Sequence, residues 1–147
     1  MRLFIEKINE YIDIGLNFEE ITEKIKEYSH KTELIFMLES MRNLANNGRV
    51  SKIAAKTAGI LGIRAVGIAS EEGTLQLMDK CRGEKRALSS IINIMKKSGF
   101  KNGKVRIGHC LNVSAADTLK NLINSEFGNV DINVYPLGGL CSIKKKK

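Results

Sequence analysis

The chain has 147 residues, of which 43% are apolar and 27% charged, as in one ordinary soluble domain. No segment approaches the roughly 20 consecutive apolar residues of a membrane span, and acidic residues interrupt the apolar pattern of the N-terminus, so we expect a cytoplasmic protein. The 24 lysines and arginines exceed the 16 acidic residues by eight. Without the last four lysines the balance is 20 against 16, and with 5% aromatic residues the composition does not favour nucleic-acid binding.

Two amphipathic helices are predicted at the start of the chain. Apolar residues recur at helical spacing over residues 4–12 and again over residues 21–28. Gly15 ends the first segment. Asn17 and Glu20 have the spacing of a capping box, which indicates that the second helix begins there.

Strand and helix signals alternate in the middle of the chain. The short apolar run over residues 34–38 predicts a central strand, and residues 39–46 predict a short helix that ends at Asn47 and Gly48. Ser51 is placed to cap a further helix, which continues to Leu61.

Segments 63–70 and 74–81 are strand-like, and the short connection that ends at Gly73 predicts that they pair as an antiparallel hairpin. Residues 84–98 carry apolar side chains on one helical face, and residues 104–111 alternate as a strand does.

Ser114 and Asp117 predict the start of one more helix, with Leu122 among its inward-facing residues, and a last strand begins at Asp131. No linker or repeat divides the chain. The pattern predicts the α/β class, as a two-layer sandwich in which helices pack on a mixed sheet of about five strands.

Nucleotide-binding, zinc-binding and hydrolase motifs are absent from the sequence, so we expect neither a cofactor nor a metal. The cysteines are too far apart for a zinc site, and Cys81 and Cys110 are expected to be free buried thiols. Cys141 follows a glycine-rich turn and is the best candidate nucleophile, but no spacing ties it to His30 or His109, so simple packing is the favoured interpretation. His109 lies on the apolar face of its strand, which is typical of a core histidine bonded to backbone.

Cations gather at two junctions that lead into helices. Arg82, Lys85 and Arg86 surround one helix start, where free amides and arginines suit a phosphate or carboxylate, although a solvated helix face is the simpler interpretation. Arg49 and Ser51 mark a second such junction. Two junctions of this kind favour the interpretation that one face of the protein binds anionic groups.

The helix after Ser51 has a face of very small side chains, formed by Ala54, Ala55, Ala58 and Gly59. Such a face either packs closely against a sheet or leaves a slot for an extended apolar ligand. The residues alone do not decide between the two.

The succession LESMRNLANNGRVSKIAAKTAGILGIRAVGIASEEGTLQLMDKCRGEKRAL, followed by VRIGHC and ADTLKNL, resembles the C-terminal half of the DegV family. The resemblance runs from about Phe4 to about Ile143. It implies that residues 1–143 form a DegV-like C-terminal domain, preceded by the closing helices of an N-terminal domain that is missing here, with residues 144–147 as a lysine tail. The chain would then be a fragment of a longer protein.

The resemblance also implies a function. DegV proteins are bacterial, non-enzymatic carriers that hold a long-chain fatty acid in an apolar tunnel, and some present its carboxylate to a separate ATP-binding fatty acid kinase subunit. The implied fatty acid or phosphate contacts are Arg49, Ser51, Arg82, Cys141 and Ser142. The implied tunnel-lining residues are Ala54, Ala55, Ala58 and Leu137. Cys141 stands where the family carries histidine, and a thiol and a hydroxyl can still donate to a carboxylate.

Two other function classes remain open at this point. A nucleic-acid or protein interaction module would use the basic residues, and its binding would weaken steeply with salt. Those residues are Arg49, Lys52, Lys56, Arg82, Lys85, Arg86 and the lysine tail. A cysteine hydrolase would need Cys141 to be unusually reactive. The fragment is further expected to self-associate through the apolar face that a missing domain would cover.

Overall fold

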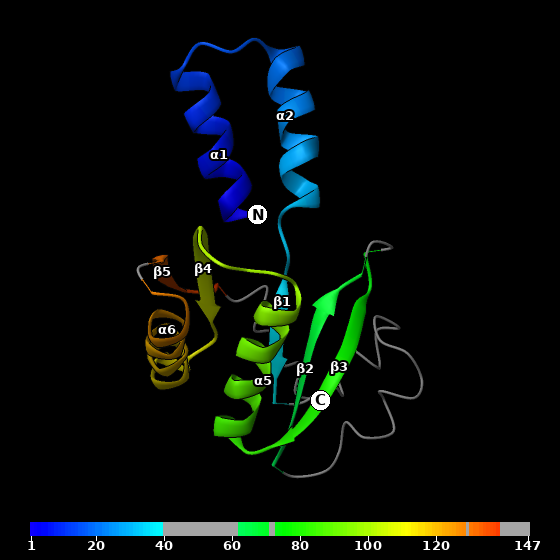
Figure 1. Cartoon of the computed structure of the whole chain (residues 1–147), viewed down its shortest axis with the longest axis vertical. Coiled ribbons are helices and arrows are strands. Elements are labelled where there is room, and N and C mark those ends of the chain that lie inside the picture. Colours follow the sequence, from blue (N-terminus) through cyan, green and yellow to red (C-terminus); the bar gives the residue numbers. More distant parts are fainter. Residues whose placement is uncertain (40–61, 71–72, 129, 139–147) are drawn as a thin grey trace. The chain divides into compact units, whose positions relative to one another are not determined.

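The chain divides into two compact units, residues 1–34 and 35–147. The computed structural model describes residues 1–39, 62–70, 73–128 and 130–138 (Figure 1). In these described residues there is no helix long and apolar enough to cross a membrane.

The first unit is a helical hairpin, drawn in blue in Figure 1. It consists of α1 (Arg2–Asp13) and α2 (Phe18–His30). The predicted capping box is confirmed, because the Glu20 amide donates to the Asn17 side chain at 3.0 Å and the Asn17 amide donates to the Glu20 carboxylate at 2.9 Å. Between the helices, the rings of Phe4 and Tyr28 pack edge to face with centroids 5.7 Å apart.

The second unit contains a three-stranded antiparallel sheet. Its strands are β1 (Ile35–Leu38), β2 (Ile63–Ala69) and β3 (Leu75–Arg82), in the order β1-β2-β3. The predicted hairpin of β2 and β3 is confirmed. The prediction that residues 34–38 form a central strand is wrong for the described sheet, because β1 lies at its edge. A short apolar run shows only that both faces of a strand are covered, and not how many neighbours the strand has.

A β-bulge interrupts the pairing of β2 with β3. Val66 pairs with Asp79 and Gly67 pairs with Leu77, so Met78 is the extra residue on β3. The bulge shifts the alternation of β3 by one position. Leu77 therefore lies on the opposite face of the sheet from Asp79, although the two are only two residues apart.

Helix α5 (Glu84–Lys97) covers one face of this sheet, and it lies between the sheet and a second α/β layer (Figure 1). That layer is a parallel pair, β4 (Lys104–His109) and β5 (Asp131–Pro136), joined by α6 (Val113–Phe127). The common core draws on both sheets and both helices. It comprises Val66, Cys81, Ala87, Leu88, Ile91, Ile92, Ile94, Met95, Ile107, Ala116, Ile123 and Val130.

The α/β class agrees with the prediction, and so does the number of strands in the described part of the chain, which is five; these strands form two sheets and not one mixed sheet. Local details of α6 differ from the prediction. Asn112, and not Ser114, caps α6 by accepting from the Ala115 amide at 3.2 Å. Leu122 is 36% exposed and does not face the core, whereas Ile123 does.

Candidate functional site

The face of the three-stranded sheet opposite α5, which we call the second face, is apolar at one end. Side chains alternate along a strand, and Val66 and Met37 pack with α5 in the core, so Phe36 and Leu38 project to the other side. A Cβ on Gly67 would lie 2.6 Å from Phe36 Cζ and 2.1 Å from the carbonyl oxygen of Gln76. The ring of Phe36 therefore lies directly over Gly67.

Next to an outer pair formed by Ala69 and Leu75, three further cross-strand rows make up the second face. The first row is Phe36, Gly67 and Leu77; the second is Leu38, Ala65 and Lys80; the third is Ile63 and Arg82. Neighbouring rows are two residues apart along β1 and β2, or roughly 7 Å, and the bulge places three residues between Leu77 and Lys80 on β3. The face therefore changes from wholly apolar in the first row to cationic at its β3 end in the second and third rows.

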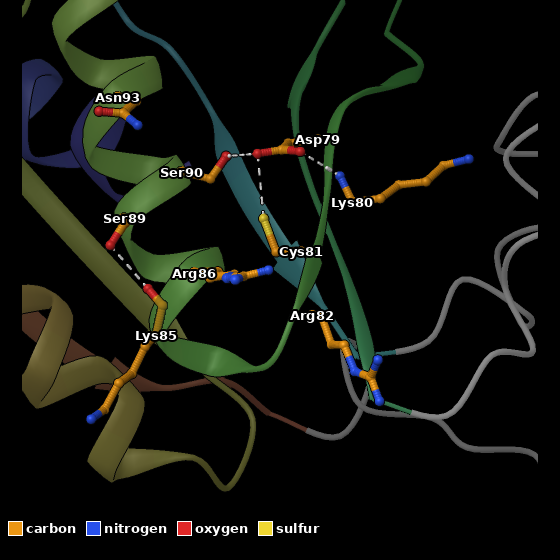
Figure 2. Close-up of a pocket in the computed structure, with 9 residues that line it drawn as sticks. All are labelled: Asp79, Lys80, Cys81, Arg82, Lys85, Arg86, Ser89, Ser90 and Asn93. Carbon is orange, nitrogen blue, oxygen red and sulfur yellow. Dashed lines mark hydrogen bonds between the residues drawn. The ribbon is translucent and has the colours of Figure 1, made fainter.

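The two cations of the second face project away from α5. Figure 2 shows Lys80 and Arg82 extending from β3 on the side opposite the helix, while Asp79 and Cys81 point toward it. Both cations are exposed. Neither has an ion-pair partner among the residues that the structure describes. An apolar surface that ends in unpaired cations suits an amphipathic anion, with its apolar part over Phe36 and its charge near Arg82.

A pocket of about 420 Å³ lies on the other side of β3, against α5 (Figure 2). Its lining residues are Asp79, Lys80, Cys81, Arg82, Lys85, Arg86, Ser89, Ser90 and Asn93. Asp79 Oδ2 accepts hydrogen bonds from the Ser90 hydroxyl at 2.7 Å and from the Cys81 thiol at 3.3 Å. The bond from Ser90 is the largest of the effects that hold the pKa of Asp79 below its usual value.

Cys81 is free and buried, as predicted, and it is not an activated nucleophile. Burial, followed by its hydrogen bond to Asp79, raises the pKa of the Cys81 thiol. Cys110 was also expected to be buried, and that prediction is wrong because Cys110 is exposed. It directly follows the last residue of β4.

The cations around the α5 pocket do not converge on one point. In Figure 2, Arg86 extends from α5 toward Cys81, whereas Lys85 extends away from β3. The structure thus brings Arg82, Lys85 and Arg86 to one junction, as predicted, but points their side chains in different directions. This arrangement is unsuited to a small anion, which would need convergent donors.

Arg64 was not singled out from the sequence, yet it connects several elements at one edge of the second unit. Its Nη2 lies 2.8 Å from Glu39 Oε1, after β1, and 3.1 Å from Glu84 Oε2, at the start of α5. Asn112 Nδ2 also donates to Glu84 Oε2 at 3.2 Å. A charged residue inside the otherwise apolar segment 63–69 was the signal that could have revealed this cluster.

Leu137 lies at the carboxyl end of the parallel strands. Its amide donates to the His109 carbonyl at 2.9 Å, and its side chain packs on Gly108, where a Cβ would come within 2.7 Å of it. His109 is half-buried, and its buried Nδ1 has no hydrogen-bond partner among the residues that the structure describes, so the expected backbone bond is not made there.

The other predicted contacts lie outside the described residues. Five of them fall within residues 40–61: Arg49, Ser51, Ala54, Ala55 and Ala58. Two fall within residues 139–147: Cys141 and Ser142. Arg82 and Leu137 are the predicted site residues that the structure places.

Comparison with known protein families identifies the fold. The model of the DegV family, a family of uncharacterised proteins, matches residues 1–144. The chain belongs to the DegV family. A DegV domain-containing protein of Streptococcus pneumoniae is 41% identical over 140 residues, and one of Streptococcus pyogenes is 41% identical over 142 residues. These matches cover 95% and 97% of this chain, and the chain spans about half the length of each relative.

Two solved structures share the fold and carry fatty acids. A DegV family protein from Eubacterium eligens, loaded with heptadecanoic acid, is 42% identical with a TM-score of 0.91. The Fatty Acid Kinase (Fak) B3 protein of Streptococcus pneumoniae, loaded with linoleic acid, is 41% identical with a TM-score of 0.90. The alignments cover 96% and 95% of this chain and 51% and 50% of those chains.

Proposed function

We propose that this DegV chain contributes one wall of a long-chain fatty acid site and works as a non-catalytic, cytoplasmic carrier. The observation that supports the proposal most directly is the polarity of the second face. Its first row is apolar across all three strands, and its only described cations, Lys80 and Arg82, stand at one end. The similarity to proteins loaded with heptadecanoic and linoleic acids supports the same ligand class.

The acyl chain would lie across the rows, with its tail over Phe36 and Leu77 and its carboxylate toward Arg82. Burial of each methylene contributes about 0.8 kcal/mol, so the acyl chain supplies most of the affinity. The cations then mainly orient the fatty acid, because exposed ion pairs contribute about 1 kcal/mol or less.

The carboxylate end of this arrangement is also the end from which a second protein would reach the ligand. We propose that a separate ATP-binding kinase subunit phosphorylates the bound carboxylate there, with Arg49 and Arg82 among the cations near it. Ser51, Cys141 and Ser142 would donate to the carboxylate, and Ala54, Ala55, Ala58 and Leu137 would line the tunnel. The name of the similar Fatty Acid Kinase (Fak) B3 protein supports a kinase system as the context.

Residues 1–143 would correspond to the C-terminal half of such a carrier. The described residues hold no group of three or more His, Cys, Asp or Glu side chains placed to bind a metal ion. The proposed role does not require a metal ion, since the carrier only binds and orients the fatty acid.

Titration of the purified chain with heptadecanoic acid, followed by native mass spectrometry, tests the proposal. We expect a one-to-one adduct. Leu38→Glu places a charge in the second row and should weaken binding about tenfold or more, because it buries a carboxylate beside the acyl chain. Arg82→Glu should weaken binding by a smaller factor.

Lys85→Glu is the matched control, because it makes the same charge reversal on α5 and away from the second face. It should bind the acid as well as the unaltered chain does. Equal binding by the Leu38→Glu and Lys85→Glu variants would contradict the placement of the ligand on the second face.

A further inference from the structure

The residues of β2 on the second face have small side chains, whereas their partners on β1 are large. Side chains alternate along a strand, and Val66 packs in the core beside α5, so its neighbours Ala65 and Gly67 project to the second face. On β1, Leu38 pairs with Ala65, and Phe36 pairs with Gly67. At these two pairs the surface over β2 is therefore lower than the surface over β1.

One large side chain extends across this low surface. The Phe36 ring lies over Gly67, where an added Cβ would come within 2.6 Å of Phe36 Cζ, closer than Cβ atoms approach other atoms in proteins. Cζ is the ring atom farthest from the backbone of β1, so the ring extends over β2 and not away from it. The ring therefore separates the surface over Ala65 from the surface over Ala69, on the other side of Gly67.

The distance from the cationic end of the second face to this ring is shorter than a long-chain fatty acid. Arg82 pairs with Ile63, which lies four residues before Gly67 on β2, or roughly 14 Å along the strand. An extended acyl chain advances about 1.25 Å per carbon, because its bonds of about 1.5 Å follow a zigzag, so about 11 carbons fill this distance. Heptadecanoic acid, which the similar Eubacterium eligens protein holds, is longer by about six carbons.

We propose that Phe36 is a specificity-determining residue, which ends the straight path of the acyl chain about 11 carbons from its carboxylate. This inference rests on the fatty acid site proposed above and adds a chain-length dependence to it. Carbons between Arg82 and the ring lie along β2, where the neighbouring strands flank them. Carbons beyond the ring must leave this line, because the ring occupies the space over Gly67, and they are covered less fully.

The affinity for saturated acids should therefore depend on chain length in two regimes. Up to the ring, two added carbons should strengthen binding about 15-fold, as full burial of two methylenes does. Beyond the ring, two added carbons should strengthen it about fourfold or less, because no more than half of their surface would be covered.

Displacement of a fluorescent long-chain fatty acid from the purified chain measures these ratios. Octanoic and decanoic acids test the first regime, and tetradecanoic and hexadecanoic acids test the second, all at concentrations below micelle formation. Decanoic acid should bind about 15-fold more tightly than octanoic acid. Hexadecanoic acid should exceed tetradecanoic acid by about fourfold or less.

Variants assign the change of regime to Phe36. Phe36→Ala uncovers Gly67 and should raise the ratio of hexadecanoic to tetradecanoic acid to about 15-fold. Phe36→Leu keeps an apolar side chain at this position but lacks the far end of the ring, so it should raise the ratio in the same direction with less disturbance of the sheet. Leu77→Ala is the control, because it truncates the first row on β3 and leaves the ring over Gly67. It should preserve the two regimes.

The possible outcomes separate this inference from the proposed function. A uniform gain from octanoic to hexadecanoic acid in the unaltered chain would overturn the role of Phe36 and leave the fatty acid site standing. Two regimes that persist in both Phe36 variants, or that disappear in Leu77→Ala, would overturn that role as well. A chain that binds neither the fluorescent acid nor any of the four saturated acids would contradict the proposed function itself, and the inference with it.

Discussion

The Ser90 hydroxyl donates a 2.7 Å hydrogen bond to Asp79 Oδ2, and this bond links α5 to the strand β3. The Cys81 thiol donates to the same oxygen at 3.3 Å. The carboxylate is placed for this contact by the bulge at Met78, which turns Asp79 toward the helix. The hydrogen bond between Ser90 and Asp79 therefore depends on the extra residue Met78 in β3.

Removal of this hydrogen bond should change the pH dependence of stability. The folded-state pKa of Asp79 is lowered, so its ionised form stabilises the fold above the unfolded-state pKa, and that contribution is lost as pH falls through the folded-state value. Ser90→Ala should lower the free energy of unfolding by about 1 kcal/mol at pH 7, and by less at pH 3. Urea unfolding at the two pH values measures this, with Ser89→Ala, on the exposed side of α5, as the control. An equal loss at both pH values would contradict the role given to the ionised carboxylate.

Gly67→Ala should strongly destabilise the second unit. The added Cβ would lie 2.1 Å from the Gln76 carbonyl oxygen and 2.6 Å from the Phe36 ring, so strand backbone must move to admit it. We expect a loss of about 2 kcal/mol or more, measured by thermal unfolding. Gly138→Ala is the matched control, because a Cβ there meets no atom within 4 Å, and it should be nearly neutral. A neutral Gly67→Ala would show that Phe36 does not lie over the glycine.

The Arg64 cluster should be energetically coupled. Arg64→Ala leaves Glu39 and Glu84 beside each other without their shared cation, and the Arg64 side chain is only 19% exposed. We expect a loss of about 2–3 kcal/mol, and a double-mutant cycle with Glu84→Gln should give a clearly non-additive result. Lys96→Ala, which breaks the exposed pair with Glu126, should cost less than about 1 kcal/mol. Additive losses in the cycle would mean that Arg64 and Glu84 do not interact in solution.

The thiols of Cys81 and Cys110 should differ widely in reactivity. Burial raises the pKa of Cys81, so less of it is thiolate at neutral pH, and the side chain is also shielded, whereas Cys110 is exposed. Iodoacetamide labelling followed by peptide mass mapping should modify Cys110 first and Cys81 only after unfolding in urea. Labelling of Cys81 at the rate of Cys110 in the native protein would contradict the packing of β3 on α5.

Local signals in the sequence were sufficient for most individual elements. The capping box at Asn17 and Glu20 is made as its spacing predicts, because its hydrogen bonds involve neighbours along the chain. The hairpin of β2 and β3 was likewise predicted from its short turn. The cap of α6 was misplaced because Ser114 and Asp117 have capping spacing too, and only the three-dimensional path of the loop selects Asn112.

Features that depend on strand order and register were not predictable. The apolar run of β1 does not encode its position at an edge of the described sheet, and the bulge at Met78 leaves no mark in the composition of β3. Strict alternation would place Leu77 and Asp79 on one face. The second face, and with it the position of Arg82 relative to Phe36, therefore emerges only from the paired strands.

The bulge at Met78 also sets which positions of β3 lie on the second face of the sheet. Before the bulge Leu77 lies on that face; after it Lys80 and Arg82 do, while Asp79 and Cys81 point toward α5. Substituting Met78 would keep this arrangement, because the number of residues is unchanged. Deleting Met78 would move every residue on one side of the bulge to the opposite face of the sheet. A change in the length of β3 should therefore disrupt this strand more than a substitution does.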